Sequence, residues 1–201
     1  MDGRKIAMAP GMKATTLLEK QHRTVESIFK KLEAGKSAPA PLLERLSNAL
    51  AAHMAIEQEL FYPAVRRVDE DLVLEAFEEH SLAEIGLKRL LATDPAHPSF
   101  AARVTACREL IEHHVEEEET ELFPKVEKKL GDAKLMELGK VMKARFDEVE
   151  AAGFKASVPA GYAKTSADVS KPGSVTSDDQ PKAVKAKPKS RSKSRDSRAV
   201  A

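Results

Sequence analysis

The 201-residue chain has no tryptophan, a single cysteine and only 4% aromatic residues. One cysteine excludes an intrachain disulfide and suits a reducing compartment, so we expect a cytoplasmic protein. The chain has no apolar run of about 18 residues or more, which predicts no membrane span. Residues 1–14 carry charges and no long apolar run, so no signal peptide is expected. It also lacks a Ser–His–Asp order, a phosphate-binding loop and a Cys-x-x-Cys motif, so we predict no catalytic residue from known motifs.

The formal net charge of +1 is the sum of an acidic N-terminal part and a basic C-terminal part. Residues 1–154 hold 22 basic and 28 acidic residues, a net of −6, whereas residues 155–201 hold 11 and 4, a net of +7. The basic part is rich in Ser, Lys, Pro and Ala and lacks helical periodicity, which predicts disorder. We therefore predict an N-terminal extension (1–14), one helical domain (15–153) and a disordered basic tail (154–201) that either solubilises the protein or contacts nucleic acid or another polyanion weakly and non-specifically.

Ala, Leu, Glu and Lys dominate the chain, as is typical of helical proteins. Capping residues, prolines and glycines place five helices. These run from about Thr16 to Gly35, Pro41 to Val68, Leu72 to Ala92, Ser99 to Leu130 and Ala133 to Ala151. Pro63 and Pro124 should bend the second and fourth helices. The fold class predicted is all-α, an up-down four-helix bundle with an extra C-terminal helix packed against it.

In each of the first four predicted helices, a histidine is followed four residues later by a glutamate. The pairs are His22 and Glu26, His53 and Glu57, His80 and Glu84, and His114 and Glu118. On an α-helix this spacing puts both side chains on one face, one turn apart. Imidazoles and carboxylates that converge from four helices are how a bundle core holds transition metals.

Several of these residues lie within the apolar face of their helix. The face of the second helix reads Leu46, Leu50, His53, Glu57, Leu60 and Ala64, and that of the fourth reads Val104, Cys107, Ile111, His114, Glu118 and Leu122. A carboxylate facing an apolar core costs several kcal/mol unless it is paired. Because no stripe of Lys or Arg faces these glutamates, we infer that a metal ion supplies the positive charge.

A second repeat indicates how many ions are bound. His53 precedes Pro63 by ten residues, and His114 precedes Pro124 by ten. This indicates an internal duplication of a helical hairpin. Each half offers two imidazoles and one carboxylate: His22, His53 and Glu57, then His80, His114 and Glu118. Two such halves suit two metal ions with the carboxylates bridging them.

At this point the residues resemble the hemerythrin-like, or HHE cation-binding, family, over about residues 15–153. The best-matching segments are His53 to Pro63 and His113 to Pro124. The resemblance implies a four-helix bundle around a non-haem, oxo-bridged pair of iron ions, with chemistry toward dioxygen, nitric oxide or peroxide. Iron is favoured by the resemblance alone, because the donor types suit manganese or zinc as well.

One position departs from the oxygen-carrying members of that family, which have a second histidine four residues after the first on the third helix. Glu84 occupies this position. The match is therefore to the broader bacterial group, and reversible oxygen carriage is not favoured. Glu84 lies on the same predicted face as His80, which makes it a candidate for a seventh ligand or for an acceptor that orients an imidazole N–H.

The remaining polar residues receive simpler interpretations. His113 is expected to lie behind His114 or at the surface, and His97 in an exposed loop. Cys107 is interpreted as a small core residue. The glutamates around Glu118 are expected to form a solvated face. They are Glu116, Glu117, Glu119 and Glu121.

Two functional classes follow from this site. One is a module that binds or senses oxygen, nitric oxide, peroxide or iron itself. The other is a di-iron enzyme, with peroxidase-like or iron–sulfur repair activity, and a third idea is an iron-handling protein tethered to nucleic acid by its tail. No substrate pocket is recognisable beyond the metal, which favours binding over catalysis. Repair proteins of the family often carry a Cys-containing N-terminal region, and no cysteine precedes the bundle here.

Overall fold

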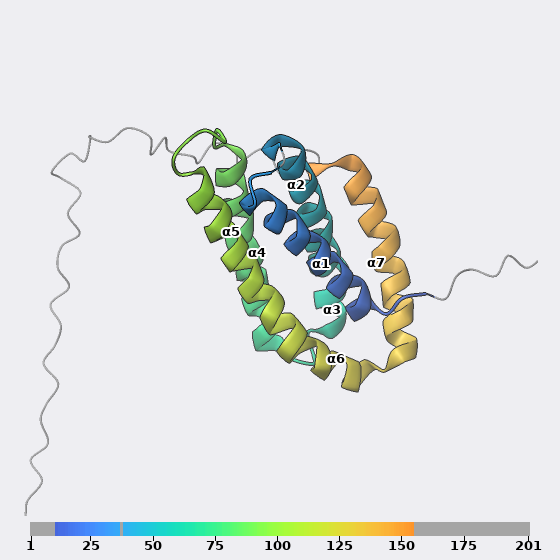
Figure 1. The fold of residues 1–201 in the computed structure, drawn as a ribbon. Helices are drawn as coiled ribbons and strands as arrows, with labels where there is room; N and C mark the ends of the chain where they lie inside the picture. The colour runs from blue at the N-terminus through green and yellow to red at the C-terminus, as the bar shows by residue number, and fades with distance from the viewer. Residues whose placement is uncertain (1–10, 37, 155–201) are drawn as a thin grey trace, which may run out of the picture. The chain divides into compact units, whose positions relative to one another are not determined.

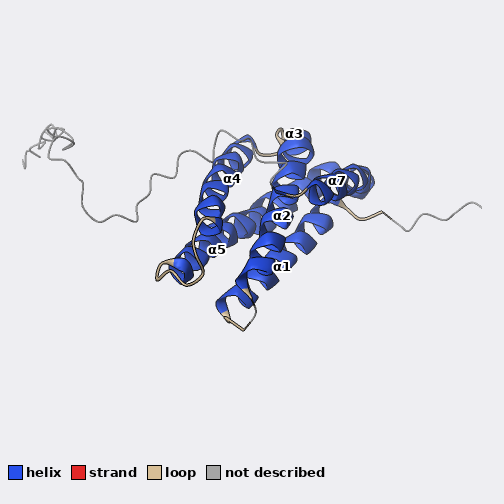
Figure 2. Cartoon of the chain, turned by 90° about the horizontal axis from the view of Figure 1, so that it is seen from above, coloured by secondary structure: helices blue, strands red, loops and turns tan. Residues whose placement is uncertain are grey.

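The structure is a computed structural model that describes residues 11–36 and 38–154. Within these ranges every regular element is helical and no strand occurs (Figures 1 and 2). This confirms the all-α fold class. The predicted tail, apart from its first residue, and most of the predicted N-terminal extension lie outside the described residues, so the proposed domain boundaries stay predictions.

The described residues form five helical rods. They are α1 (Ala14–Glu33); α2 (Pro39–Ile56) continued by η1 (Glu57–Phe61) and α3 (Tyr62–Val65); α4 (Glu70–Leu91); α5 (Phe100–Glu117) continued by η2 (Glu118–Leu122) and α6 (Phe123–Leu130); and α7 (Asp132–Ala152). The predicted five helices are thus present with ends shifted by a few residues. Helix α1 begins two residues before the expected capping residue Thr16, and its N-cap Lys13 makes no side-chain capping bond.

The two rods that carry a proline are interrupted by one turn of π-helix, in the same place in each. The carbonyl of Glu57 accepts from the backbone N–H of Tyr62, and that of Glu118 accepts from Phe123, five residues on. Pro63 and Pro124 follow directly, and proline has no N–H with which to continue the i to i+4 series. The repeat supports the predicted duplication, and turns of this kind often occur at functional sites.

The π-turn also rotates the rest of the second rod. An uninterrupted α-helix would bury Leu60 and Ala64 after Glu57, as the apolar pattern predicted. Instead Phe61 and Val65 are fully buried, and Ala64 is exposed. The extra residue in the turn moves the buried face by one position, so the predicted face is wrong beyond Glu57.

The interior contains two apolar clusters with a polar layer between them. Along α1, Leu18 belongs to one cluster and Val25 to the other, with the buried His22 between them. Along α2 the order of the two clusters is reversed, with Leu50 and Ile56 on either side of the buried His53. The histidines therefore form a band across the middle of the bundle, closed off by hydrocarbon on both sides.

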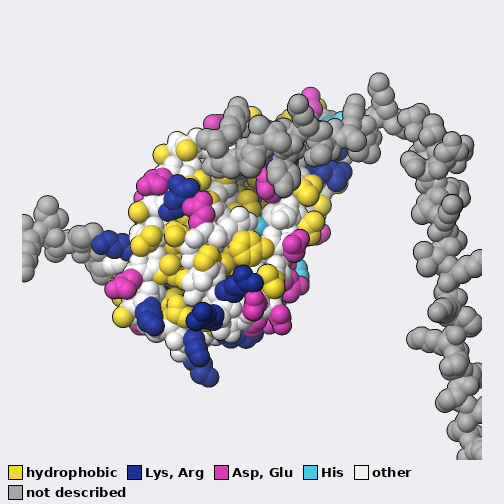
Figure 3. Space-filling model, turned by 180° about the vertical axis from the view of Figure 1, so that it is seen from behind, with side chains coloured by type: hydrophobic (Ala, Val, Ile, Leu, Met, Phe, Trp, Pro, Cys, Tyr) yellow, Lys and Arg dark blue, Asp and Glu magenta, His cyan; other side chains and the backbone are white. Residues whose placement is uncertain are grey.

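Helix α7 packs against α1 and α2, as predicted for the fifth helix (Figures 1 and 2). Leu135 and Met142 on its inner face are fully buried. Gly139 permits this packing, because a Cβ atom there would lie 2.1 Å from the carbonyl oxygen of Met12. Basic and acidic side chains are interspersed on the face seen in Figure 3. None of the described helices is long and apolar enough to cross a membrane.

Candidate metal centre

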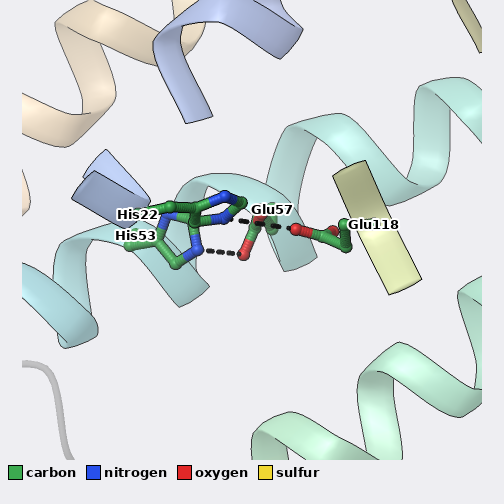
Figure 4. A group of neighbouring side chains, drawn as sticks. All are labelled: His22, His53, Glu57 and Glu118. Carbon is green, nitrogen blue, oxygen red and sulfur yellow. Dashed lines mark ion pairs between the residues drawn. The ribbon is translucent and has the colours of Figure 1, made fainter. Parts of the chain in front are cut away.

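Six buried side chains predicted from the sequence converge in the polar layer. His22, His53, Glu57 and Glu118 bring one ligand atom each within 4.8 Å of one another, and Glu57, His80 and His114 do the same. Figure 4 shows the first group, with Glu57 and Glu118 pointing toward the two imidazoles. Because Glu57 belongs to both groups, the two groups form one centre with a shared carboxylate.

The four imidazoles form two pairs that match the two halves of the duplication. The rings of His22 and His53 lie 4.8 Å apart between centroids, and those of His80 and His114 lie 4.6 Å apart. Nε2 of His53 lies 3.1 Å from Oε2 of Glu57, and Nε2 of His80 lies 3.3 Å from the same oxygen. Donor atoms about 3 Å apart are what a metal ion requires when each bond is about 2.0–2.2 Å long.

Glu118 occupies the matching position on the other side. Its Oε2 lies 3.4 Å from Nε2 of His22 and 3.7 Å from Nε2 of His114. Each carboxylate therefore faces one imidazole of each pair. Both carboxylates therefore lie between the two pairs of imidazoles.

A ring of side chains holds the opposite nitrogen of each imidazole. Nδ1 of His53 donates to Gln21 at 2.9 Å, Nδ1 of His114 donates to Glu79 at 2.8 Å, and Nδ1 of His22 donates to Glu119 at 2.8 Å. The Gln58 amide nitrogen lies 3.1 Å from Nδ1 of His80, and a half-turn of that amide would place its oxygen there instead.

Three of these four residues come from the helical rod before the one whose histidine they contact. Glu119 on the fourth rod contacts His22 on the first, so the contacts close around the bundle. An acceptor at Nδ1 fixes the proton there and leaves the Nε2 lone pair free for a metal. All four contacts were missed by the sequence analysis, and Glu119 was assigned to a solvated face. The sequence did contain one indication of these contacts, since each contacting residue stands next in sequence to a predicted ligand. The four residues are Gln21, Gln58, Glu79 and Glu119.

Burial and the close approach of these groups shift the pKa values of the residues in the layer in different directions. Burial, followed by repulsion from Glu118, raises the pKa of Glu57 well above its usual range. Burial is the main cause that lowers the pKa of His80 to about 3, and the charge of His114 lowers it further. Burial likewise lowers the pKa of His53, and the charge of His22 adds to the effect. Burial alone would raise the pKa of Glu118, but the neighbouring imidazoles His114 and His22 bring it below its usual range.

The donor atoms also lack partners of their own. Nε2 of His22, both carboxylate oxygens of Glu57 and Oε2 of Glu118 are buried without a hydrogen-bond partner among the described residues. Orphaned buried polar atoms are rare and costly in proteins. The unpartnered atoms of His22, Glu57 and Glu118 face one another across the centre. Imidazole nitrogen and carboxylate oxygen are donor types that bind transition metals. The residues present therefore fit a metal site.

Tyr62 is a further residue of the centre that the sequence analysis did not identify. Its hydroxyl donates to Oε1 of Glu118 at 3.0 Å and lies 3.2 Å from Nε2 of His80. The sequence indicates this residue through a difference between the two halves of the repeat. Tyr62 precedes Pro63 in the first half, whereas Phe123 precedes Pro124 in the second.

The other candidates lie outside the centre. Glu84 is partly exposed, and its carboxylate pairs with Lys88 one turn along α4. Ala83 packs inward in its place, so the structure does not bring Glu84 to the four imidazoles. His97 is exposed, as expected. Cys107 is buried in the core as a free thiol whose pKa burial raises to about 11, which agrees with a packing role.

Comparisons with known proteins agree with this geometry. Residues 13–126 match the domain family described as hemerythrin HHE cation binding domain. The chain is 27% identical over 142 residues to an uncharacterized protein of Mycobacterium tuberculosis, Rv2633c. This match covers 69% of the chain and 88% of Rv2633c. It is 25% identical over 143 residues to a DNA nickase of Nostoc sp., but the match spans 69% of this chain and only 40% of that protein's length.

The fold has a solved counterpart. A crystal structure of a hemerythrin HHE cation binding domain-containing protein, the Rv2633c homolog from Mycobacterium kansasii, superposes with a TM-score of 0.64 at 27% sequence identity. The match covers 70% of this chain and 89% of that one.

Proposed function

This chain belongs to the hemerythrin HHE cation-binding family, and we propose that it holds two iron ions side by side to bind or sense oxygen, nitric oxide or peroxide. The single observation that carries this proposal is the shared carboxylate Glu57, which lies in both His/Glu groups. A one-metal site would need only one of these groups. Two buried imidazole pairs with carboxylates between them support a pair of ions.

In this proposal His22 and His53 hold one ion and His80 and His114 hold the other. Glu57 and Glu118, which each face one imidazole of both pairs, would be shared between the two ions. Each ion would then have four protein donors, which would leave positions for solvent and one external ligand on iron. Zinc would more often be satisfied with four donors. Iron pairs, when bound, supply the redox chemistry that oxygen, nitric oxide and peroxide require.

The surrounding residues support a small external ligand. A cavity of about 20 Å³ lies against the four imidazoles. Its other walls are apolar: Val25, Leu50, Met54, Ala83, Ile111 and Val115. A space of this size holds roughly one water-sized molecule. Apolar walls disfavour water, so a diatomic gas suits this cavity better than a polar substrate, and this favours binding or sensing over turnover of a larger molecule.

The test is a metal analysis joined to an optical spectrum of the aerobically purified full chain. We expect two iron ions per chain and an oxo-to-iron absorption band in the near ultraviolet, and we expect the spectrum to change on addition of nitric oxide. One zinc ion per chain, or no metal after iron-replete expression, would rule out the di-iron proposal. Steady consumption of added peroxide over many turnovers would favour the peroxidase-like alternative instead.

We also propose that the basic tail contacts nucleic acid or another polyanion. The observation that supports it is the net charge of +7 over residues 155–201. The contact would then be electrostatic and independent of sequence.

A further inference from the structure

A fifth His-x-x-x-Glu pair lies on α5, next to the pair that enters the core. His113 and Glu117 are one turn apart, with their side chains 61% and 27% exposed. Nε2 of His113 lies 3.6 Å from Oε1 of Glu117. The pair therefore presents an imidazole and a carboxylate to solvent in the geometry that binds metals on a helix.

Glu79 on the neighbouring helix α4 completes a group of three. Its Oε1 lies 3.6 Å from Nε2 of His113, and one ligand atom each of Glu79, His113 and Glu117 lies within 4.8 Å of the others. Glu79 is only 9% exposed. Its Oε1 makes no hydrogen bond within the described part of the chain, whereas its Oε2 accepts from Nδ1 of His114 at 2.8 Å.

The carboxylates of this group are not neutralised by a basic side chain of the described residues. Neither Glu79 nor Glu117 forms an ion pair with a lysine or arginine among residues 11–36 and 38–154. Glu75 and Glu121 are close enough to act electrostatically on Glu117. One imidazole and two carboxylates are donors that divalent transition metals accept, with water in the remaining positions.

We propose that Glu79, His113 and Glu117 form a peripheral site for one divalent transition-metal cation on the surface of α4 and α5. The site is separate from the buried centre but touches it through Glu79, which contacts His113 with one oxygen and His114 with the other. It takes a hydrated cation, because three protein donors leave room for water. The proposal does not require iron in the buried centre.

Mn²⁺ is a suitable probe, because the electron paramagnetic resonance signal of the free ion falls as it binds. The desalted full-length chain is titrated with Mn²⁺ alongside His113→Ala and Glu117→Gln. Both substitutions are at side chains that are not fully buried, so the bundle should fold normally, and melting curves check this. Glu79 is left intact because it also orients His114. The matched control is His97→Ala, which removes another exposed histidine from a distant loop.

We expect wild type and His97→Ala to bind one more Mn²⁺ per chain than His113→Ala, and Glu117→Gln to bind that ion at least tenfold more weakly than wild type. Equal Mn²⁺ uptake by wild type and His113→Ala would overturn the proposal, and so would an equal loss in His97→Ala. If the buried centre proves empty, extra ions will bind to every variant, but the difference of one ion will persist. Failure of the di-iron proposal and failure of this one are therefore distinguishable.

Discussion

The hydroxyl of Tyr62 donates a hydrogen bond of 3.0 Å to Oε1 of Glu118, which joins the second helical rod to the fourth inside the candidate centre. Burial, followed by the charges of Glu118 and Glu57, raises the pKa of Tyr62 well above its usual range, so the phenol stays protonated and remains a donor. The equivalent position in the other half of the duplication is Phe123, which has no hydroxyl. The carboxylates of Glu57 and Glu118 are therefore not equivalent.

Tyr62→Phe should destabilise the protein while leaving its metal content unchanged. The ring would still pack against Phe77, but Oε1 of Glu118 would lose its donor in a buried site. Leaving a buried acceptor unsatisfied costs about 1–3 kcal/mol. Denaturant unfolding measures this loss, and elemental analysis checks the metal. A variant as stable as wild type, with an identical optical spectrum, would show that the hydrogen bond contributes nothing.

Removal of the metal should lower the melting temperature. Without an ion, the carboxylate of Glu57 is buried with both oxygens lacking a hydrogen-bond partner among the described residues. An ion that binds only the folded chain adds about 2.7 kcal/mol of stability at a free concentration one hundred times its dissociation constant. Melting curves with and without a strong chelator measure the effect, and re-addition of metal should restore the original curve. Unchanged melting after complete metal removal would contradict the proposed centre.

Replacement of a proposed ligand should have a larger effect than replacement of an exposed histidine. His53→Ala or His114→Ala removes a donor and leaves a carboxylate buried with less compensation, so we expect loss of metal and lower stability. His97→Ala changes an exposed side chain and should alter neither iron content nor melting temperature. If His97→Ala loses iron as severely as His114→Ala, the ligand assignment is wrong.

The Nδ1 contacts allow a test of orientation separate from ligation. Glu119→Ala removes the acceptor for Nδ1 of His22, and losses of such contacts typically weaken metal affinity by about 10–100-fold. Glu119→Gln keeps an acceptor oxygen and should retain affinity close to wild type. Glu116→Ala is the control, because that side chain is exposed on the same helical rod. Competition with a chromogenic chelator gives the affinities, and equal values for the Ala and Gln variants would refute an orienting role.

The spacing of His53, Glu57, His114 and Glu118 was enough to predict the bundle and the convergence of these side chains. Helical periodicity places both members of an i, i+4 pair on one face. The same rule failed beyond Glu57, because the π-turn before Pro63 adds a residue to the turn. Such a turn depends on which backbone hydrogen bonds the proline removes, and the apolar pattern does not record it.

Glu84 illustrates a second limit. Neighbouring positions on a helix differ by about 100°, so the apolar pattern alone could not decide whether Glu84 or Ala83 faces the core. The structure turns Ala83 inward and leaves Glu84 beside Lys88. The ring of Nδ1 contacts could not be predicted for a related reason, since it depends on which helices are adjacent around the bundle.

The basic tail should be dispensable for the metal centre and necessary for any contact with DNA. Residues 155–201 carry a net charge of +7, whereas residues 1–154 carry −6 and would be repelled by phosphates. Truncation before Lys155 should therefore leave iron content and melting temperature nearly unchanged and abolish any retardation of DNA in a gel. Binding by the full chain should weaken steeply as salt rises and show little sequence preference, because it rests on the release of counterions from phosphates. If the full chain does not retard DNA even at low salt, the tail is instead a solubilising or protein-binding segment.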